Sequence, residues 1–206
     1  MGDMIDSLDS MHFDILKELG NIGAGNAATA LSKLIDNKVA MKIPQVKLLS
    51  FQETAEILDS PEELVFGILV SLSGDINGIM MFLVKEDSAK ALIRCLLGPS
   101  GTSDDEVFSE MDLSALQEIG NILSSSYLSA LATVAGKSVR PSVPSLAKDM
   151  AGAILSVPAI EFGKIADKVL FIESVFGADE ENVSGYFILV PDLPSFSIIL
   201  SALGVG

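Results

Sequence analysis

A glutamate and an asparagine, three residues apart, recur in the two halves of this sequence. Glu18 and Asn21 lie in the first half, and Glu118 and Asn121 follow 100 residues later. A short polar residue precedes each glutamate by four positions, and a proline follows each asparagine after 22 intervening residues: Asp14 and Pro44, then Ser114 and Pro144. A side-chain amide both donates and accepts hydrogen bonds, and so can orient a water molecule. A carboxylate can bind a cation on another molecule.

These polar residues fall on one face of a predicted helix. At roughly 100° per residue, Asp14, Glu18 and Asn21 lie within an arc of about 60°. The opposite face is apolar in both copies, as a helix packed on a core requires. A polar stripe is usually only the solvated face of a helix. Two observations favour a binding surface instead: the stripe recurs in both halves, and small residues, Gly25 and Ser125, continue it.

Catalysis by such a stripe would be phosphoryl transfer. This reaction needs mainly positioning and charge neutralisation, and a glutamine positions the attacking water in some GTPases. The metal and the phosphoryl group would come from the substrate protein. Its cation would pair with the glutamate and set the docking register.

Other catalytic motifs are weak. The run Gly23-Ala24-Gly25-Asn26-Ala27-Ala28 fits a dinucleotide-binding turn, but it lies inside a helical pattern with no strand before it. His12 is the sole histidine, and the sequence contains no Cys/His metal-binding spacing. We therefore expect no metal or cofactor held by this chain itself, and no covalent nucleophile.

Composition narrows the class of partner. The 206 residues are 49% hydrophobic and carry a net charge of −15, which argues against nucleic acid and against an anionic membrane surface. The single cysteine, Cys95, excludes an internal disulfide and is predicted to be buried. The N-terminus lacks signal-peptide features, and prolines and an aspartate interrupt the apolar run over 188–205. We expect a cytoplasmic protein without membrane insertion.

The order of elements predicts an α/β (α+β) fold of a single domain over 1–206. Two repeats, about 9–99 and 106–204, would be joined by a short polar connector at Pro99 to Asp105. Ser7 or Asp9 would cap the first helix. We expect a largely antiparallel central sheet with the two long motif-bearing helices packed on it in pseudo-twofold fashion. The predicted helices are 9–35, 52–58, 86–97, 109–135, 146–151 and 193–203, and the predicted strands are 38–49, 63–74, 76–85, 137–144, 153–160, 168–177 and 183–190.

The spaced pattern (D/S)-x-x-x-E-x-x-N, then 22 residues, then proline, resembles the signature of the CheC/CheX/FliY family of chemotaxis phosphatases. Both copies match at every position, and the similarity extends over essentially the whole chain. With two intact motifs and no additional flagellar-switch domain, the sequence is most similar to the CheC type. The resemblance implies hydrolysis of the aspartyl phosphate of the response regulator CheY, which would supply the Mg²⁺.

The resemblance also implies roles for individual residues. Asn21 and Asn121 would orient the attacking water, and Glu18 and Glu118 would bind the regulator's active-site lysine. Asp14 and Ser114 would support the docking face, while Pro44 and Pro144 would be structural.

Further partners follow from the same resemblance. The receptor deamidase CheD would bind, with Asp149 as the candidate contact because the surrounding segment could imitate a receptor helix, or could be an ordinary short helix. We expect a monomer. The alternative from another class is a non-catalytic adaptor of the chemotaxis or flagellar switch that binds CheY or CheD, since FliM keeps a similar fold without the motif.

Overall fold

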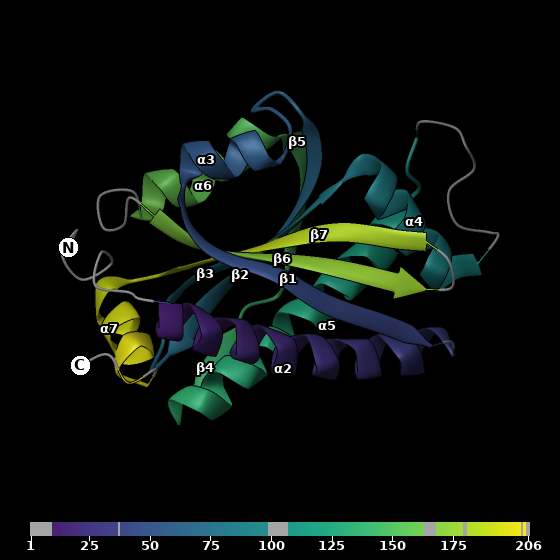
Figure 1. The fold of residues 1–206 in the computed structure, drawn as a ribbon. Coiled ribbons are helices and arrows are strands. Elements are labelled where there is room, and N and C mark those ends of the chain that lie inside the picture. The colour runs from purple at the N-terminus through teal and green to yellow at the C-terminus, as the bar shows by residue number, and fades with distance from the viewer. Residues whose placement is uncertain are drawn as a thin grey trace.

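The computed structural model describes residues 10–36, 38–98, 107–162, 168–178, 181–202 and 204. The two halves place the same kinds of element in the same order (Figure 1). The first half contains α2 (Ser10–Ile35), β1 (Val39–Ser50), α3 (Phe51–Ile57), β2 (Leu64–Gly74), β3 (Gly78–Lys85) and α4 (Glu86–Leu97). The second contains α5 (Glu110–Ala135), β4 (Val139–Pro141), β5 (Ser145–Met150), α6 (Ala151–Phe162), β6 (Lys168–Ala178), β7 (Glu181–Pro191) and α7 (Leu193–Ala202).

The halves exchange strands within one antiparallel sheet. Its order is β1-β6-β7-β3-β2-β4, and β5 also pairs with β2. Strand β1 of the first half pairs with β6 of the second, and the equivalent β5 pairs with β2 of the first. The registers agree as well, since Ser50 lies opposite Lys168 while Met150 lies opposite Leu64. The pseudo-twofold axis therefore passes between the central strands β3 and β7, and neither half completes the sheet alone.

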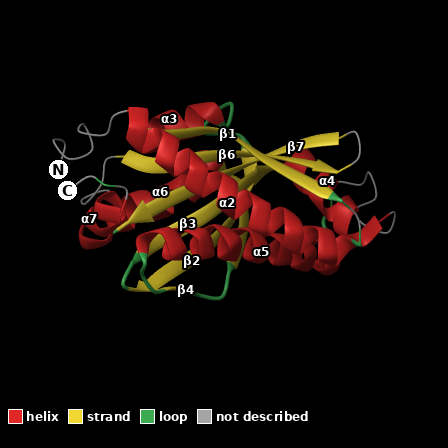
Figure 2. Ribbon diagram, turned by 60° about the horizontal axis from the view of Figure 1, so that its bottom comes forward, coloured by secondary structure: helices red, strands yellow, loops and turns green. Residues whose placement is uncertain are grey.

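Helices cover both faces of this sheet. The long helices α2 and α5 lie across one face, and α3 and α6 lie on the other (Figures 1 and 2). Strand β3 is buried along nearly its whole length, because its side chains alternate between the two cores. Phe82 packs with the core under α2 and α5, whereas the next residue, Leu83, packs with the core under α3 and α6.

The long helices meet at a close crossing. A Cβ on Gly23 would lie 2.8 Å from Cδ1 and 3.0 Å from Cα of Tyr127, so these helices approach where glycine leaves room. The Tyr127 hydroxyl shares a hydrogen bond of 2.9 Å with the buried Ser174 hydroxyl on β6. Figure 1 shows α2 and α5 running in opposite directions, as the pseudo-twofold requires.

Local signals set the ends of α5. Ser109 caps the helix, because its hydroxyl accepts from the Asp112 amide while the Asp112 carboxylate accepts from the Ser109 amide at 2.9 Å. Gly136 closes it in the left-handed conformation at φ 60°. The prediction of a helix over 109–135 is confirmed.

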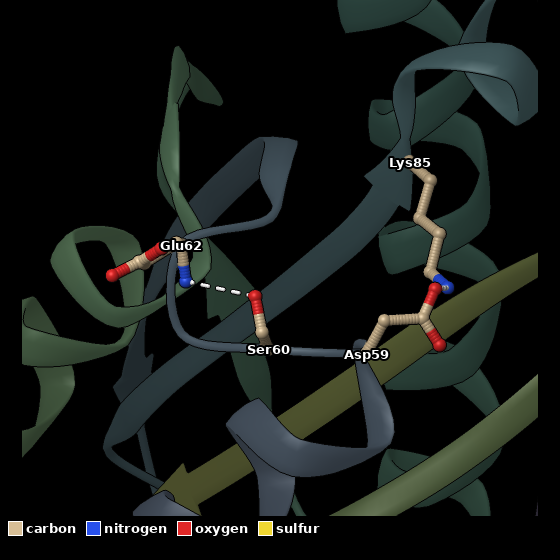
Figure 3. Close-up of polar contacts among 4 residues, drawn as sticks. All are labelled: Asp59, Ser60, Glu62 and Lys85. Atoms are coloured by element: carbon tan, nitrogen blue, oxygen red, sulfur yellow. Dashed lines mark hydrogen bonds and ion pairs between the residues drawn. The ribbon is translucent and has the colours of Figure 1, made fainter.

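The turn between α3 and β2 is held by polar contacts. Asp59 has a φ of 80°, a region that side chains with a Cβ rarely adopt. Ser60 Oγ accepts from the Glu62 amide at 3.2 Å, and the Lys85 ammonium at the end of β3 pairs with the Asp59 carboxylate (Figure 3). These contacts fix α3 against the β2–β3 hairpin.

Two sequence predictions are wrong, and they concern neighbouring segments. The predicted helix at 146–151 is the edge strand β5, which is held by pairing with β2. The predicted strand at 153–160 is the helix α6. Its buried residues are Ala151, Ile154, Leu155 and Pro158. They follow a helical period that is hard to recognise in a mostly apolar sequence.

Smaller differences concern the edge of the sheet and α4. Only Val139–Pro141 of the predicted strand over 137–144 forms β4. Cys95 is exposed rather than buried. The other predicted helices and strands are confirmed within a few residues. The proposed caps Ser7 and Asp9, and the connector from Pro99 to Asp105, lie outside the described residues, so the repeat boundaries stay predictions.

Candidate active site

The repeated polar stripes face away from the sheet. Asp14, Glu18 and Asn21 are exposed on α2. On α5, Ser114 and Glu118 are exposed and Asn121 is half-buried. The opposite face of each helix enters the core, through Leu16 and Leu19 on α2 and through Leu116 and Ile119 on α5. Both glutamate–asparagine pairs are therefore accessible to another macromolecule.

The two stripes lie on opposite sides of the helix crossing. Gly23 meets Tyr127 there, and both motifs precede these residues in their own helices. Because α2 and α5 run in opposite directions, Glu18 and Glu118 lie on opposite sides of the crossing. The chain thus carries two separate surfaces rather than one composite site.

The two surfaces differ at the position four residues before each glutamate. Asp14 carries a carboxylate, whereas the Ser114 hydroxyl donates a hydrogen bond of 2.8 Å to the Glu110 carbonyl oxygen of its own helix. A second difference lies at Gly25 and Ser125, both of which are exposed. The glycine-rich run at 23–28 lies within α2, so no strand-to-helix turn is present there to hold a dinucleotide.

Both prolines of the repeated pattern lie where the edge strand is interrupted. The register of β1 against β6 shifts between Lys42 and Gln45, on either side of Pro44. At the equivalent place β4 ends at Pro141 and β5 begins at Ser145, just after Pro144. A proline has no amide hydrogen to donate to a ladder, which explains an interruption at both positions.

One contact at the second surface was not anticipated from the sequence. The Gln117 side-chain amide donates a hydrogen bond of 2.7 Å to the Pro144 carbonyl oxygen. Gln117 directly precedes Glu118, so this bond ties the helix carrying the glutamate to the interrupted edge strand. The equivalent residue of the first half, Lys17, is exposed. The signal for this contact in the sequence is a side-chain amide, that of Gln117, directly before a motif glutamate.

Asp149 lies on β5, not on a helix, which overturns the expectation that its segment imitates a receptor helix. It is exposed, and its carboxylate accepts from the Met150 amide at 2.8 Å. Its neighbour Lys148 pairs with Glu86 at 2.7 Å, and that hydrogen bond helps to hold the Glu86 pKa below its ordinary value. Since successive strand residues alternate, Asp149 points to the opposite side of the sheet from Lys148.

The described part of the chain contains no group of three or more His, Cys, Asp or Glu residues that could hold a metal ion. Within the same residues, no helix has both the length and the apolar character needed to span a membrane.

The segments of this chain that match a known protein family cover the two motif helices. A sequence model of the CheC-like family matches residues 11–48 and 111–147, which are the two motif helices with the segments that follow them. The CheY-P phosphatase CheC of Bacillus subtilis is 36% identical over 196 residues, covering 94% of both chains. The flagellar motor switch phosphatase FliY of the same bacterium is 31% identical over 140 residues, covering 68% of this chain and 36% of that protein.

Solved structures share the fold at low sequence identity. FliY of Thermotoga maritima superposes with a TM-score of 0.76 at 18% identity, over 96% of this chain and 98% of that one. The FliM middle domain of H. pylori gives 0.69 at 14% identity, over 95% and 99%. The near-full-length 36% identity, together with a family match in each half, shows that the chain belongs to the CheC-like family.

Proposed function

We propose that this protein hydrolyses the aspartyl phosphate of the response regulator CheY at both motif surfaces. The phosphatase class follows from 36% identity, over 94% of each chain, with a CheY-P phosphatase. The observation that carries the proposal is the presentation of a glutamate–asparagine pair toward solvent in each half, on helices whose other face is buried. A surface built this way acts on a phosphoryl group that a second protein brings to it.

The proposed reaction is attack of water on phosphorus. The amide of Asn21 or Asn121 would hold the water in line, and the bond between phosphorus and the aspartyl oxygen would break. The products are inorganic phosphate and a free aspartate carboxylate, while the proton of the water leaves with phosphate or solvent. The regulator would supply the Mg²⁺ that neutralises the phosphoryl oxygens.

Glu18 and Glu118 would set the register of docking. In this proposal each carboxylate pairs with the active-site lysine of CheY and places the neighbouring asparagine over the phosphoryl group. An exposed ion pair contributes little affinity, so its value here is orientation. Asp14 would add a second carboxylate at the first surface, whereas the Ser114 hydroxyl is already bonded within its helix. We therefore propose that the two surfaces are unequal.

A second partner, CheD, belongs to the same proposal. Asp149 remains the candidate contact, now as an exposed residue of the edge strand β5 immediately before α6. A monomer in the cytoplasm is also part of the proposal. The alternative is an adaptor that binds CheY or CheD without hydrolysis. The likeness to FliM favours it only at the level of fold, and both intact glutamate–asparagine pairs favour catalysis.

The test is phosphate release from phosphorylated CheY with the wild type, Asn21→Ala, Asn121→Ala and the double variant. Asn26→Ala is a matched control, because Asn26 is an exposed asparagine of the same helix outside the motif. We expect each single variant to lose part of the activity, the double variant to lose nearly all, and the control to keep it. A double variant as active as an accelerating wild type would refute the role given to the two asparagines, and a wild type without acceleration would favour the adaptor.

A further inference from the structure

Two exposed methionines occupy equivalent positions in the two repeats. Met11 is 60% exposed on α2, and Met111 is 66% exposed on α5. A single exposed apolar residue needs no explanation in a soluble protein. Here the exposure recurs after 100 residues, although several residues between each methionine and the motif glutamate have changed: Phe13, Ile15 and Lys17 become Leu113, Ala115 and Gln117.

Each methionine lies on the motif face of its helix. Met11 precedes Glu18 by seven residues, which is two turns, so the two side chains stand in line along α2. Ile22 follows Asn21 and is 43% exposed on the same face. At roughly 100° per residue, Met11 and Ile22 border Glu18 on one side, while Asp14 and Asn21 border it on the other.

The second repeat has the same two-sided layout. Met111 precedes Glu118 by seven residues, and Ile122, which is half-buried, follows Asn121. Both helices thus present a polar edge with the motif asparagine and an apolar edge with a methionine and an isoleucine. The apolar edge is continuous with the surface proposed to act on the phosphoryl group.

We propose that Met11 with Ile22, and Met111 with Ile122, bind an apolar patch of the phosphorylated regulator beside its phosphoryl group and determine recognition of that protein. This inference rests on the proposed function. Exposed ion pairs at Glu18 or Glu118 contribute little affinity. Methionine supplies apolar area on a flexible side chain that adapts to a partner's surface. These residues therefore act on binding, while the asparagines act on the chemical step.

The experiment compares KM and kcat for phosphorylated CheY between the wild type and Met11→Ala/Met111→Ala. We expect KM to rise roughly tenfold, with kcat within about twofold of the wild type. Met11→Leu/Met111→Leu should restore KM, because leucine keeps the apolar area. The control is Ile160→Ala, since Ile160 is 77% exposed on α6, on the other face of the sheet.

The outcomes separate the two proposals. An inactive wild type refutes the phosphatase itself. An active wild type with an unchanged KM in the methionine variant refutes only the apolar edge, and so does a loss of kcat at unchanged KM. Thermal unfolding of each variant tests whether the fold is intact. We expect an intact fold, because both methionines are exposed.

Discussion

The side-chain amide of Gln117 donates a hydrogen bond of 2.7 Å to the carbonyl oxygen of Pro144. The donor lies beside Glu118, and the acceptor lies where the edge strand is interrupted between β4 and β5. A proline cannot donate to a strand ladder, so the interruption leaves its carbonyl oxygen available to α5. The bond ties α5 to the edge strand directly beside Glu118, in addition to the core packing of Leu116 and Ile119 on the opposite face of the helix.

Removal of this donor should affect the second surface more than the fold. Gln117→Ala should lower the free energy of unfolding by about 1 kcal/mol. In an Asn21→Ala background, where only the second surface works, it should also reduce phosphate release from CheY. Gln117→Glu should behave like alanine, because a carboxylate cannot donate to a carbonyl oxygen. Lys17→Ala in the Asn121→Ala background is the matched control and should change little. Equal losses from both variants would contradict the role given to this bond.

The two central glycines of α2 should respond in opposite ways to alanine. A Cβ at Gly23 would lie 3.0 Å from the Tyr127 Cα, which belongs to backbone and cannot move aside. We expect Gly23→Ala to destabilise by about 1–2 kcal/mol, as overpacking outweighs the gain in helix propensity. A Cβ at Gly25 meets nothing within 4 Å. Gly25→Ala should therefore stabilise by up to about 1 kcal/mol.

Urea unfolding of both variants measures this contrast. Since Gly25 lies on the exposed stripe, Gly25→Ala also reports on docking: a more stable protein with a higher KM for phosphorylated CheY would place the partner's backbone against this position. Destabilisation by both substitutions to the same extent would refute the close crossing at Gly23.

Local sequence signals predict most helices and strands, but they do not predict which strands pair with each other. Ser109 and Gly136 bound α5 through contacts within a few residues, so the sequence pattern locates that helix well. Pairing of β1 with β6 depends on contacts more than 100 residues apart, as between Ser50 and Lys168. Periodicity within one strand carries no information about its neighbour, which is why the strand exchange was not predicted.

The errors at β5 and α6 have a related cause. Strand β5 is short and mostly exposed, and its conformation comes from pairing with β2, as where Asp149 lies opposite Val65. Helix α6 is mostly apolar, so its sequence resembles that of a buried strand. At the candidate site, the motif residues were recognisable by spacing, whereas the bond between Gln117 and Pro144 joins residues that only the folded chain brings together.

Replacement of Asp59 by glycine should destabilise the protein less than replacement by alanine. Its φ of 80° strains any residue with a Cβ, although aspartate tolerates this region better than most. Asp59→Ala loses the ion pair with Lys85 and keeps the strain, so we expect a loss of about 1 kcal/mol. Asp59→Gly loses the same ion pair but relieves the strain, so its stability should stay within about 0.5 kcal/mol of the wild type. Thermal unfolding ranks them, and an equal loss from both would mean that the ion pair dominates.

Stability should fall at alkaline pH through the two tyrosines of this chain. Burial raises the pKa of Tyr127 above its ordinary value, with the hydrogen bond shared with Ser174 opposing the shift, and burial also raises the pKa of Tyr186. A raised pKa in the folded state means that the stabilisation is complete below the ordinary pKa of about 10. Above that pH the unfolded chain ionises while the folded protein does not, so the free energy of unfolding falls by about 1.4 kcal/mol per pH unit for Tyr127.

Tyr127→Phe removes one of these titrating groups. At pH 8 it should be less stable by about 1–2 kcal/mol, because the buried Ser174 hydroxyl loses its partner. Above pH 10 its stability should decline less steeply than that of the wild type, because one of the two buried tyrosines is gone. Urea midpoints between pH 8 and pH 11 measure both effects, and tyrosinate absorbance follows ionisation directly. Identical slopes for the two proteins would show that Tyr127 ionises in the folded state, and its burial against α2 and β6 would then be wrong.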